Sequence, residues 1–451
     1  MRRARFVPPV VVIVLLAIIA MTAAAPASAD VATAGRRPRR PRVIVSPRAV
    51  MVDQPFRTIV RGVPPKGLVE LRVTLNAGGY VWSSDATFRS DRRGRIDVAR
   101  DAPVSGDYQG VEPMGLIWSA RLAGTAPVPP DHIPWTDTAR ISAYVEGKEV
   151  ATTPLTRFYL RPGGRSVNVR AHGLVGTYFA PPGRGRHPAV LVFGGSEGGK
   201  TYPELTAAML ASHGYAALAL AYFDPTGALP GIPRNLSAIP LEYFRTAIRW
   251  LGHRPSVDST RVGVWGASRG GELALLLGTR NHSLHAVVAN APSSVVWSGL
   301  PDFTRAAWTS RGRPVPFLIP KVGDGPTGYD WYLNALRDPH ANPAATIPVE
   351  KIDGPVLLDN GADDQLWPSQ PMTEMIMARL RAHHHRYRDV HLSFPGTGHV
   401  IPLPNVPVTL VVGPGIGGNA RDTAHSGVEA WYRTLKFLHR ALDERHRRRV
   451  A

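Results

Sequence analysis

One serine of this chain stands between two glycines where an apolar segment passes into a helical one, and no other feature constrains the fold as strongly. The segment "RVGVW" is followed by "GASRG", residues 266–270, and then by "GELALLLG". In a strand–turn–helix unit, glycines on both sides let the turn pass close to the neighbouring strand and helix. Ser268 would lie in a strained turn, with its hydroxyl above a helix N-terminus that favours negative charge. We therefore predict that Ser268 is a nucleophile.

Two periodicities divide the remaining sequence. Residues 43–160 contain short segments, among them "LVELRVTLN" and "ARISAYVEG", that alternate apolar and polar side chains between turn residues. This pattern is typical of a β-sandwich. After a linker at 161–166, near-continuous apolar segments such as "PAVLVFGG" alternate with helical ones over residues 167–445, which predicts a parallel sheet covered by helices. The predicted fold class is α/β: an α/β-hydrolase domain with an N-terminal β-sandwich domain.

The second half also predicts five helices and one long connection. The helices are expected at 202–213, 240–253, 270–280, 369–384 and 425–444. Residues 297–350, between two predicted strands, are rich in proline and glycine and too long for an ordinary connection. We expect a lid over a pocket there.

A serine hydroxyl needs a base, and on this fold an acid and then a histidine follow the nucleophile along the chain. "PVLLDNGADD" ends a predicted strand and contains Asp359, Asp363 and Asp364. Asp364 is the predicted acid and Asp363 the fallback, since Asp359 still lies within the strand; each could instead cap a turn or a helix. His399, in "GTGH" after the last predicted strand, is the predicted general base.

The loop "FGGSEGGKT", residues 193–201, admits two interpretations. From Gly194 to Thr201 it matches the phosphate-loop pattern G-x-x-x-x-G-K-[ST], and "ALALAYFD" could supply a Mg²⁺-binding aspartate. Alternatively it forms half of an oxyanion hole, in which two backbone N–H groups bind the charge that develops on a carbonyl oxygen. One donor would come from Arg269, and the other from the loop at Gly194 and Gly195. The order of serine, acid and histidine favours the oxyanion hole.

With these residues placed, the chain resembles the acyl-CoA thioesterase and bile acid-CoA:amino acid N-acyltransferase family from about 43 to 442. In the first half the resemblance rests on "VDQPFRTIVRGVPPKGLVELRVTL" and "GDYQGVEPMGLIWSA". In the second half it rests on "PAVLVFGGSEGG", "VGVWGASRGGELALLL", "GADDQLWPSQ" and "PGTGHVIPLP", in that order. It implies a nucleophile at Ser268, an acid at Asp364 and a base at His399, with no metal or organic cofactor.

The resemblance also implies a reaction. The family's transferases use cysteine, and this chain has none. Hydrolysis of an acyl thioester, with water as acceptor, is therefore favoured over transfer to an amine. The alternatives are a secreted carboxylesterase or lipase, an acyl transferase, and a non-enzymatic binding protein on a hydrolase scaffold. His383, His384 and His385 are not expected to bind metal, because consecutive helical residues point in different directions.

The N-terminus and the charge distribution predict where the protein works. Residues 1–29 read as a secretory signal, with early arginines, the apolar "VVVIVLLAIIAM" and a small-residue cleavage site at 27–29. The alternative is an uncleaved membrane anchor. The net charge of +19 includes two basic tails, "RRPRRPR" at 36–42, within a tail of residues 30–42, and "ERHRRRV" at 444–450. We expect these tails to contact anionic envelope or lipid surfaces rather than nucleic acid, because aromatic residues are not interleaved with the arginines. If the protein is secreted or lies in the cell envelope, the sequence does not decide whether the leaving group is CoA or another thiol or alcohol.

Overall fold

The computed structural model describes residues 40–444, apart from 78–79, 124–134 and 339. The predicted signal sequence lies outside the described residues, and so do residues 30–39 and 445–450 of the two basic tails. Within them, no helix is long and apolar enough to cross a membrane. Residues from Arg40 onward form one compact unit, so the sandwich and the α/β region share contacts.

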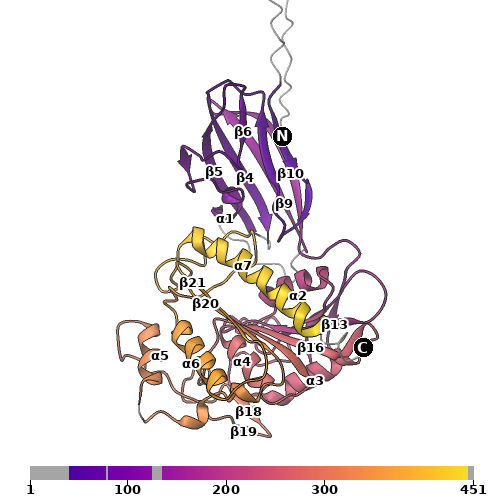
Figure 1. Cartoon of the computed structure of the whole chain (residues 1–451), viewed down its shortest axis with the longest axis vertical. Coiled ribbons are helices and arrows are strands. Elements are labelled where there is room, and N and C mark those ends of the chain that lie inside the picture. Colours follow the sequence, from indigo (N-terminus) through magenta and orange to yellow (C-terminus); the bar gives the residue numbers. More distant parts are fainter. Residues whose placement is uncertain (1–39, 78–79, 124–134, 339, 445–451) are drawn as a thin grey trace, which may run out of the picture. The chain divides into compact units, whose positions relative to one another are not determined.

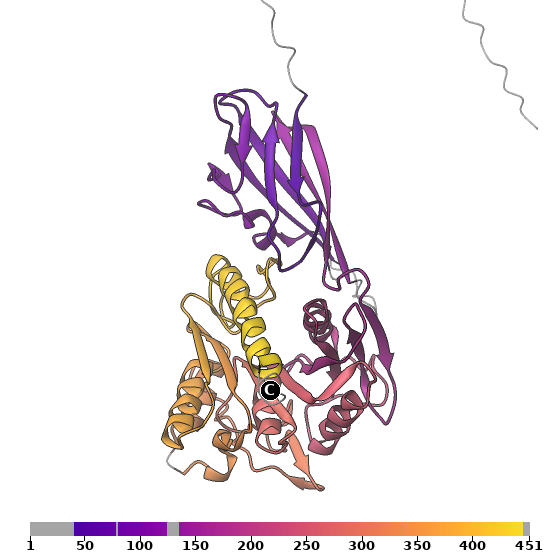
Figure 2. The same ribbon diagram turned by 45° about the vertical axis from the view of Figure 1, so that its right-hand side comes forward.

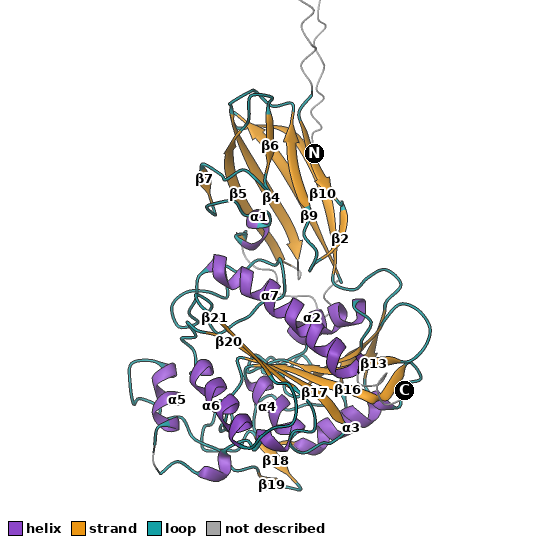
Figure 3. Ribbon diagram, in the orientation of Figure 1, coloured by secondary structure: helices purple, strands orange, loops and turns teal. Residues whose placement is uncertain are grey.

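The N-terminal part consists of two antiparallel-rich sheets packed face to face (Figures 1 and 3). The smaller sheet has the order β1 (Arg42–Ser46), β3 (Arg57–Arg61), β6 (Arg95–Asp97). The larger has the order β2 (Ala49–Met51), β10 (Lys148–Phe158), β9 (Thr136–Val145), β4 (Leu68–Ala77), β5 (Tyr80–Arg89), β7 (Ser105–Gly106), with β8 (Arg121–Leu122) also paired to β5. Alternate residues of β4, from Val69 to Leu75, are fully buried, as the period of two predicts. A single-turn helix, α1 (Gly115–Trp118), follows β7.

The second part is built on an eight-stranded sheet. The pairings among the first three strands of its order are antiparallel, and all later pairings are parallel. Its order is β11 (Arg165–Val169), β12 (Val175–Ala180), β14 (Ala216–Ala221), β13 (His187–Phe193), β16 (Val257–Ala267), β17 (Leu284–Asn290), β20 (Val356–Gly361), β21 (Val390–Phe394). In chain order these strands run 1-2-4-3-5-6-7-8, the arrangement of an α/β-hydrolase. The predicted fold class is confirmed.

Helices cover both faces of this sheet. One face packs against α2 (Thr201–Ser212) and α7 (Ala420–Leu438), and the other against α3 (Leu241–Gly252), α4 (Arg269–Gly278) and α6 (Ser369–Ala382). The five predicted helices are confirmed, but α7 begins five residues earlier than predicted because Asn419 caps it by accepting the backbone N–H of Asp422 at 3.0 Å. A π-helical turn, His439–Glu444, completes the predicted range.

The stretch predicted as a lid holds short elements. They are β18 (Trp308–Ser310), β19 (Arg313–Pro314), α5 (Gly328–Leu336) and two 3-10 turns, Pro343–Ala345 and Val349–Lys351. β18 pairs with β15 (Ile239–Pro240), just before α3. Whether this stretch moves as a lid stays a prediction.

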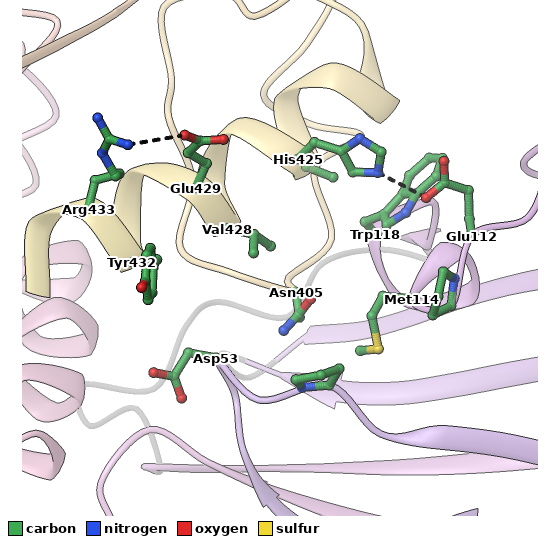
Figure 4. Close-up of a pocket in the computed structure, with 13 residues that line it drawn as sticks. Asp53, Glu112, Met114, Trp118, Asn405, His425, Val428, Glu429, Tyr432 and Arg433 are labelled. Atoms are coloured by element: carbon green, nitrogen blue, oxygen red, sulfur yellow. Dashed lines mark hydrogen bonds and ion pairs between the residues drawn. The ribbon is translucent and has the colours of Figure 1, made fainter. Parts of the chain in front are cut away.

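Helix α7 contacts both the large sheet and the sandwich (Figures 1 and 2). Asp53 of the sandwich accepts from Trp431 Nε1 at 2.9 Å and pairs with His213 Nε2 at 2.5 Å. Glu112 accepts from Arg421 and His425 at 2.7 and 2.9 Å. Between these contacts lies a mainly apolar cavity of about 610 Å³, lined from both sides (Figure 4). Polar bonds from the first turns of α7, from Trp431 further along it and from His213 therefore hold the two parts together.

The pairing of Asp53 makes a prediction about stability. Burial raises the pKa of this carboxyl, but the bonds from His213 and Trp431 outweigh burial and lower it. A lowered pKa stabilises the fold above the unfolded pKa of about 4, and that stability is lost as pH falls through the folded pKa. We expect Asp53→Asn to lower the free energy of unfolding by about 1–3 kcal/mol at pH 7. The deficit should shrink below about pH 4.

Urea denaturation of wild type and variant at both pH values measures this difference. Asp324→Asn, at an exposed turn, is the matched control and should cost little at either pH. A deficit for Asp53→Asn that is equal at neutral and acid pH would contradict the assignment of the stability to the ionised carboxylate.

Candidate active site

Ser268 lies between the last residue of β16 and the first residue of α4, in a backbone conformation that only a tight turn requires. Its φ and ψ are 56° and −121°, a strained combination for a residue with a side chain. A Cβ at Gly266 would lie 2.1 Å from the Gly270 carbonyl oxygen, and one at Gly270 would lie 2.3 Å from that of Gly194. The backbone N–H of Ser268 donates to Asn290 O at 2.8 Å, which ties the turn to β17. These contacts give the physical reason for the glycine spacing.

The predicted acid and base lie beside this serine. His399 Nε2 is 3.0 Å from Ser268 Oγ, and His399 Nδ1 is 2.8 Å from Asp364 Oδ2. Both His399 and Asp364 are buried, at 7% exposure each. The carboxylate also accepts the backbone N–H groups of Leu366 and Trp367 and, at 2.6 Å, the hydroxyl of Ser369. A chain of hydrogen bonds thus runs from a fixed carboxylate through the imidazole to the serine.

The other aspartates have different surroundings. Asp363 is exposed. Asp359 is fully buried within β20, where burial raises the pKa of its carboxyl well above the usual range. With the amide of Asn290 oriented so that its nitrogen faces β20, that nitrogen donates to the two Asp359 carboxyl oxygens at 3.2 and 3.3 Å. Of the three candidates, Asp364 is the one bonded to His399.

The three histidines of the run at the end of α6 have different surroundings. His383 and His384 are exposed, whereas His385 bonds to Asp389 at 2.7 Å and to the Ile352 carbonyl at 2.9 Å. Across the described ranges, no group of three or more His, Asp or Glu side chains is arranged to hold a metal ion.

The glycine-rich loop between β13 and α2 lies directly against Ser268. A Cβ at Gly195 would lie 2.9 Å from Ser268 Cβ, so no larger residue fits there. Tyr222 Oη donates to the carbonyls of Gly194 and Gly195 at 2.8 and 3.2 Å and fixes the loop. Lys200, the lysine of the phosphate-loop pattern, instead donates to Glu204 at 2.6 Å. The loop is therefore placed where an oxyanion hole would be.

The backbone and the side chain of Arg269 make separate contributions to the site. Its backbone N–H belongs to the first turn of α4, where helical N–H groups have no intrahelical acceptor. Its side chain, which the sequence analysis did not consider, is buried and donates to the carbonyls of Trp297 and Ser298 at 3.0 and 2.9 Å. Glu272 lies 3.2 Å from the guanidinium and accepts Trp308 Nε1 at 2.6 Å. This network fixes the start of the 297–350 stretch to the helix that carries the serine.

Two comparisons with known proteins, one with family profiles and one with individual sequences, agree on a family. The profile described as "BAAT / Acyl-CoA thioester hydrolase C terminal" matches residues 239–444, and "Acyl-CoA thioester hydrolase/BAAT N-terminal region" matches 53–171. Mouse acyl-coenzyme A thioesterase 6 is 31% identical over 87% of this chain and 94% of its own length. The chain belongs to the acyl-CoA thioester hydrolase family.

Further matches support this membership. Mouse peroxisomal succinyl-coenzyme A thioesterase is 29% identical over 88% of this chain and 95% of its own length. Human acyl-coenzyme A thioesterase 1 is 30% identical over 86% of this chain and 94% of its own length. The "Dienelactone hydrolase family" profile also matches residues 175–298, which include the glycine-rich loop after β13 and the turn at Ser268. As a member of this family, the chain is a thioester hydrolase.

An aromatic series links α5 to the predicted base of this thioester hydrolase. The ring centroids of Trp297 and Tyr332 are 4.7 Å apart, those of Tyr332 and Trp367 are 5.9 Å apart, and Trp367 lies 5.8 Å from the His399 ring. Sequence reasoning missed this series, because its members are distant along the chain and no local pattern pairs them.

The contact between Gly195 and Ser268 generates a prediction. Gly195→Ala places a methyl group against the nucleophile and is expected to lower the rate of Ser268 modification by a fluorophosphonate by about a hundredfold, since displacement of reacting groups by about 1 Å has that effect. Gly328→Ala, whose Cβ has ordinary room at 3.7 Å, is the control and should react like wild type. Equal rates for Gly195→Ala and wild type would show that the loop does not confine the serine.

Proposed function

We propose that this protein hydrolyses acyl thioesters through a covalent acyl-enzyme on Ser268. The observation that carries the proposal is the continuous chain of hydrogen bonds from Asp364 through His399 to Ser268. It lies at the carboxyl end of the parallel strands, with the glycine-rich loop opposite. A serine hydroxyl becomes an effective nucleophile when an oriented imidazole can take its proton.

The reaction proceeds in two halves. In the first, His399 Nε2 takes the hydroxyl proton while Ser268 Oγ attacks the thioester carbonyl carbon, and Asp364 stabilises the imidazolium. The negative charge on the carbonyl oxygen is stabilised by the backbone N–H of Arg269 and by the Gly194–Gly195 loop. The carbon–sulfur bond then breaks, and the leaving thiolate takes the proton from His399.

In the second half, His399 removes a proton from water, which attacks the acyl-enzyme carbonyl. The bond between the acyl carbon and Ser268 Oγ then breaks, Ser268 Oγ takes the proton from His399, and a carboxylic acid is released. These steps use only groups of this chain and water.

The names of the relatives support acyl-CoA as the substrate class. Those named above are acyl-CoA and succinyl-CoA thioesterases, matched along nearly their whole lengths. Water is the proposed acceptor, and the absence of cysteine from the sequence argues against the cysteine-dependent amine transfer that the family resemblance also suggests. Hydrolysis of oxygen esters is the alternative that shares every catalytic group.

Turnover of matched substrates tests the proposal. Purified protein should hydrolyse acyl-CoAs of at least one chain length faster than the matched p-nitrophenyl esters. Ser268→Ala should reduce kcat at least about a thousandfold. Ser283→Ala, at an exposed turn, is the control and should leave the rate unchanged. Hydrolysis of the p-nitrophenyl esters without release of CoA would mean that the protein is a carboxylesterase. No turnover of acyl-CoAs or of esters would favour a binding protein.

We further propose that the protein is exported, on the basis of the N-terminal sequence alone. Fractionation of cells that express the full chain, followed by mass measurement of its N-terminal peptide, tests this. An extracytoplasmic protein that begins at Asp30 is expected. Cytoplasmic protein that retains residues 1–29 would contradict export.

A further inference from the structure

One of the two donors that the proposed reaction needs is already occupied within the protein. The backbone N–H of Gly195 donates to Oε1 of Glu197 at 2.8 Å. A Cβ on Gly194 would lie 2.1 Å from the same oxygen, and one on Gly195 would lie 2.9 Å from Oε2. The carboxylate is therefore packed against both glycines of the loop. Because Gly195 also abuts Ser268, this carboxylate lies beside the nucleophile.

A carboxylate at this donor conflicts with the charge that the reaction creates. The carbonyl oxygen of the substrate becomes negative in the tetrahedral intermediate, and two negative groups repel each other at one N–H donor. The two groups cannot both accept from Gly195 in the intermediate. Reaction therefore requires Glu197 to leave this position or to lose its charge.

The surroundings of Glu197 do not hold the carboxylate there strongly. The nearest lysine along the chain, Lys200, is bonded to Glu204 instead. Burial raises the pKa of Glu197, while hydrogen bonds from its own backbone N–H and from that of Gly195, together with the charge of His399, act in the opposite direction. Tyr202 and Tyr222, the other titratable groups facing it, are phenols whose pKa values are raised by burial, and they carry no charge near neutral pH. Two backbone N–H groups, its own and that of Gly195, thus attach the carboxylate to the loop.

The side chain of Glu197 also has room to move from the loop toward solvent. Glu197 and the preceding Ser196 are exposed residues, although the carboxylate turns back onto the loop. Gly198 and Gly199 follow, both with φ of +67°. Rotation about the side-chain bonds alone would move the carboxylate toward solvent and leave the loop backbone and Tyr222 in place.

We propose that Glu197 closes the oxyanion hole of the resting enzyme and that binding of the substrate carbonyl displaces its carboxylate from Gly195. The inference rests on the proposed function, since it assigns a resting state to the same site. In this state the site does not present its full set of donors to a small carbonyl compound. The substrate carbonyl occupies the oxyanion hole only when the substrate's other contacts with the protein outweigh the bond between Glu197 and Gly195.

The rate of Ser268 modification by a small fluorophosphonate, whose phosphoryl oxygen needs the same donors, tests the proposal. At pH 8, Glu197→Ala should react about tenfold faster than wild type, because a charge-assisted hydrogen bond no longer competes. Glu197→Gln should lie between the two, since a neutral amide oxygen still accepts from Gly195. Glu429→Gln, which removes an exposed carboxylate from α7, is the matched control and should match wild type.

The pH dependence of the modification rate distinguishes two roles of Glu197: closure of the oxyanion hole and structural support of the loop. As pH falls through the pKa of Glu197, the wild-type side chain becomes neutral, so the ratio of Glu197→Gln to wild type should fall toward one. Effects of pH that are common to both proteins cancel in this ratio. Thermal unfolding of each variant confirms that the loop remains folded.

Each other outcome is informative. Slower modification of both Glu197 variants at every pH would mean that the side chain supports the loop, and it would overturn the proposal. A ratio that stays at one from pH 5 to pH 9 would overturn it as well. Absence of modification of Ser268 in wild type and in all variants would instead overturn the proposed function, and the closure with it.

Discussion

The close approach of two backbone segments, the turn at Ser268 and the loop after β13, is the constraint on which the rest of the site depends. A Cβ at Gly270 would lie 2.3 Å from the carbonyl oxygen of Gly194, so the two segments touch without any side chain between them. The contact fixes how far the serine stands from the loop donors. His399 reaches the serine from a separate segment, the one after β21. Glycine at these positions is a steric requirement rather than a source of flexibility.

A second set of contacts positions the acid and the stretch above the sheet. Asp364 receives three protein donors besides His399, which keeps the carboxylate in one orientation. Arg269 joins the nucleophile helix to Trp297 and Ser298, and Glu272 joins the same helix to Trp308. Burial raises the pKa of Glu272 to about 7 against the opposing charge of Arg269. The helix that carries the serine is thus also the support for the segments that surround it.

The sequence predicted those parts of the site that local pattern and chain order determine. Ser268 follows from glycine spacing, and His399 and Asp364 follow from their places after successive strands. The bounds of α7 were less accurate, because Asn419 caps the helix through a bond that residue periodicity does not reveal. The sequence did not single out Glu197 within the glycine-rich loop. Its contact with Gly195 depends on a side chain that turns back on its own loop, and no periodicity encodes that rotation. The buried guanidinium of Arg269 was missed because its acceptors lie 28 and 29 residues away.

The position of Asp53 has a consequence for how this architecture can vary. This carboxylate belongs to the sandwich, yet its partners are Trp431 on α7 and His213 at the end of α2, the two helices that cover one face of the large sheet. Val52 and Tyr159 of the sandwich pack in the same apolar cluster as Trp431. Removal of the sandwich would therefore leave an unpaired indole and an exposed apolar helix face on the hydrolase. Exchange of either half for another domain would therefore require matching changes on both sides of this contact.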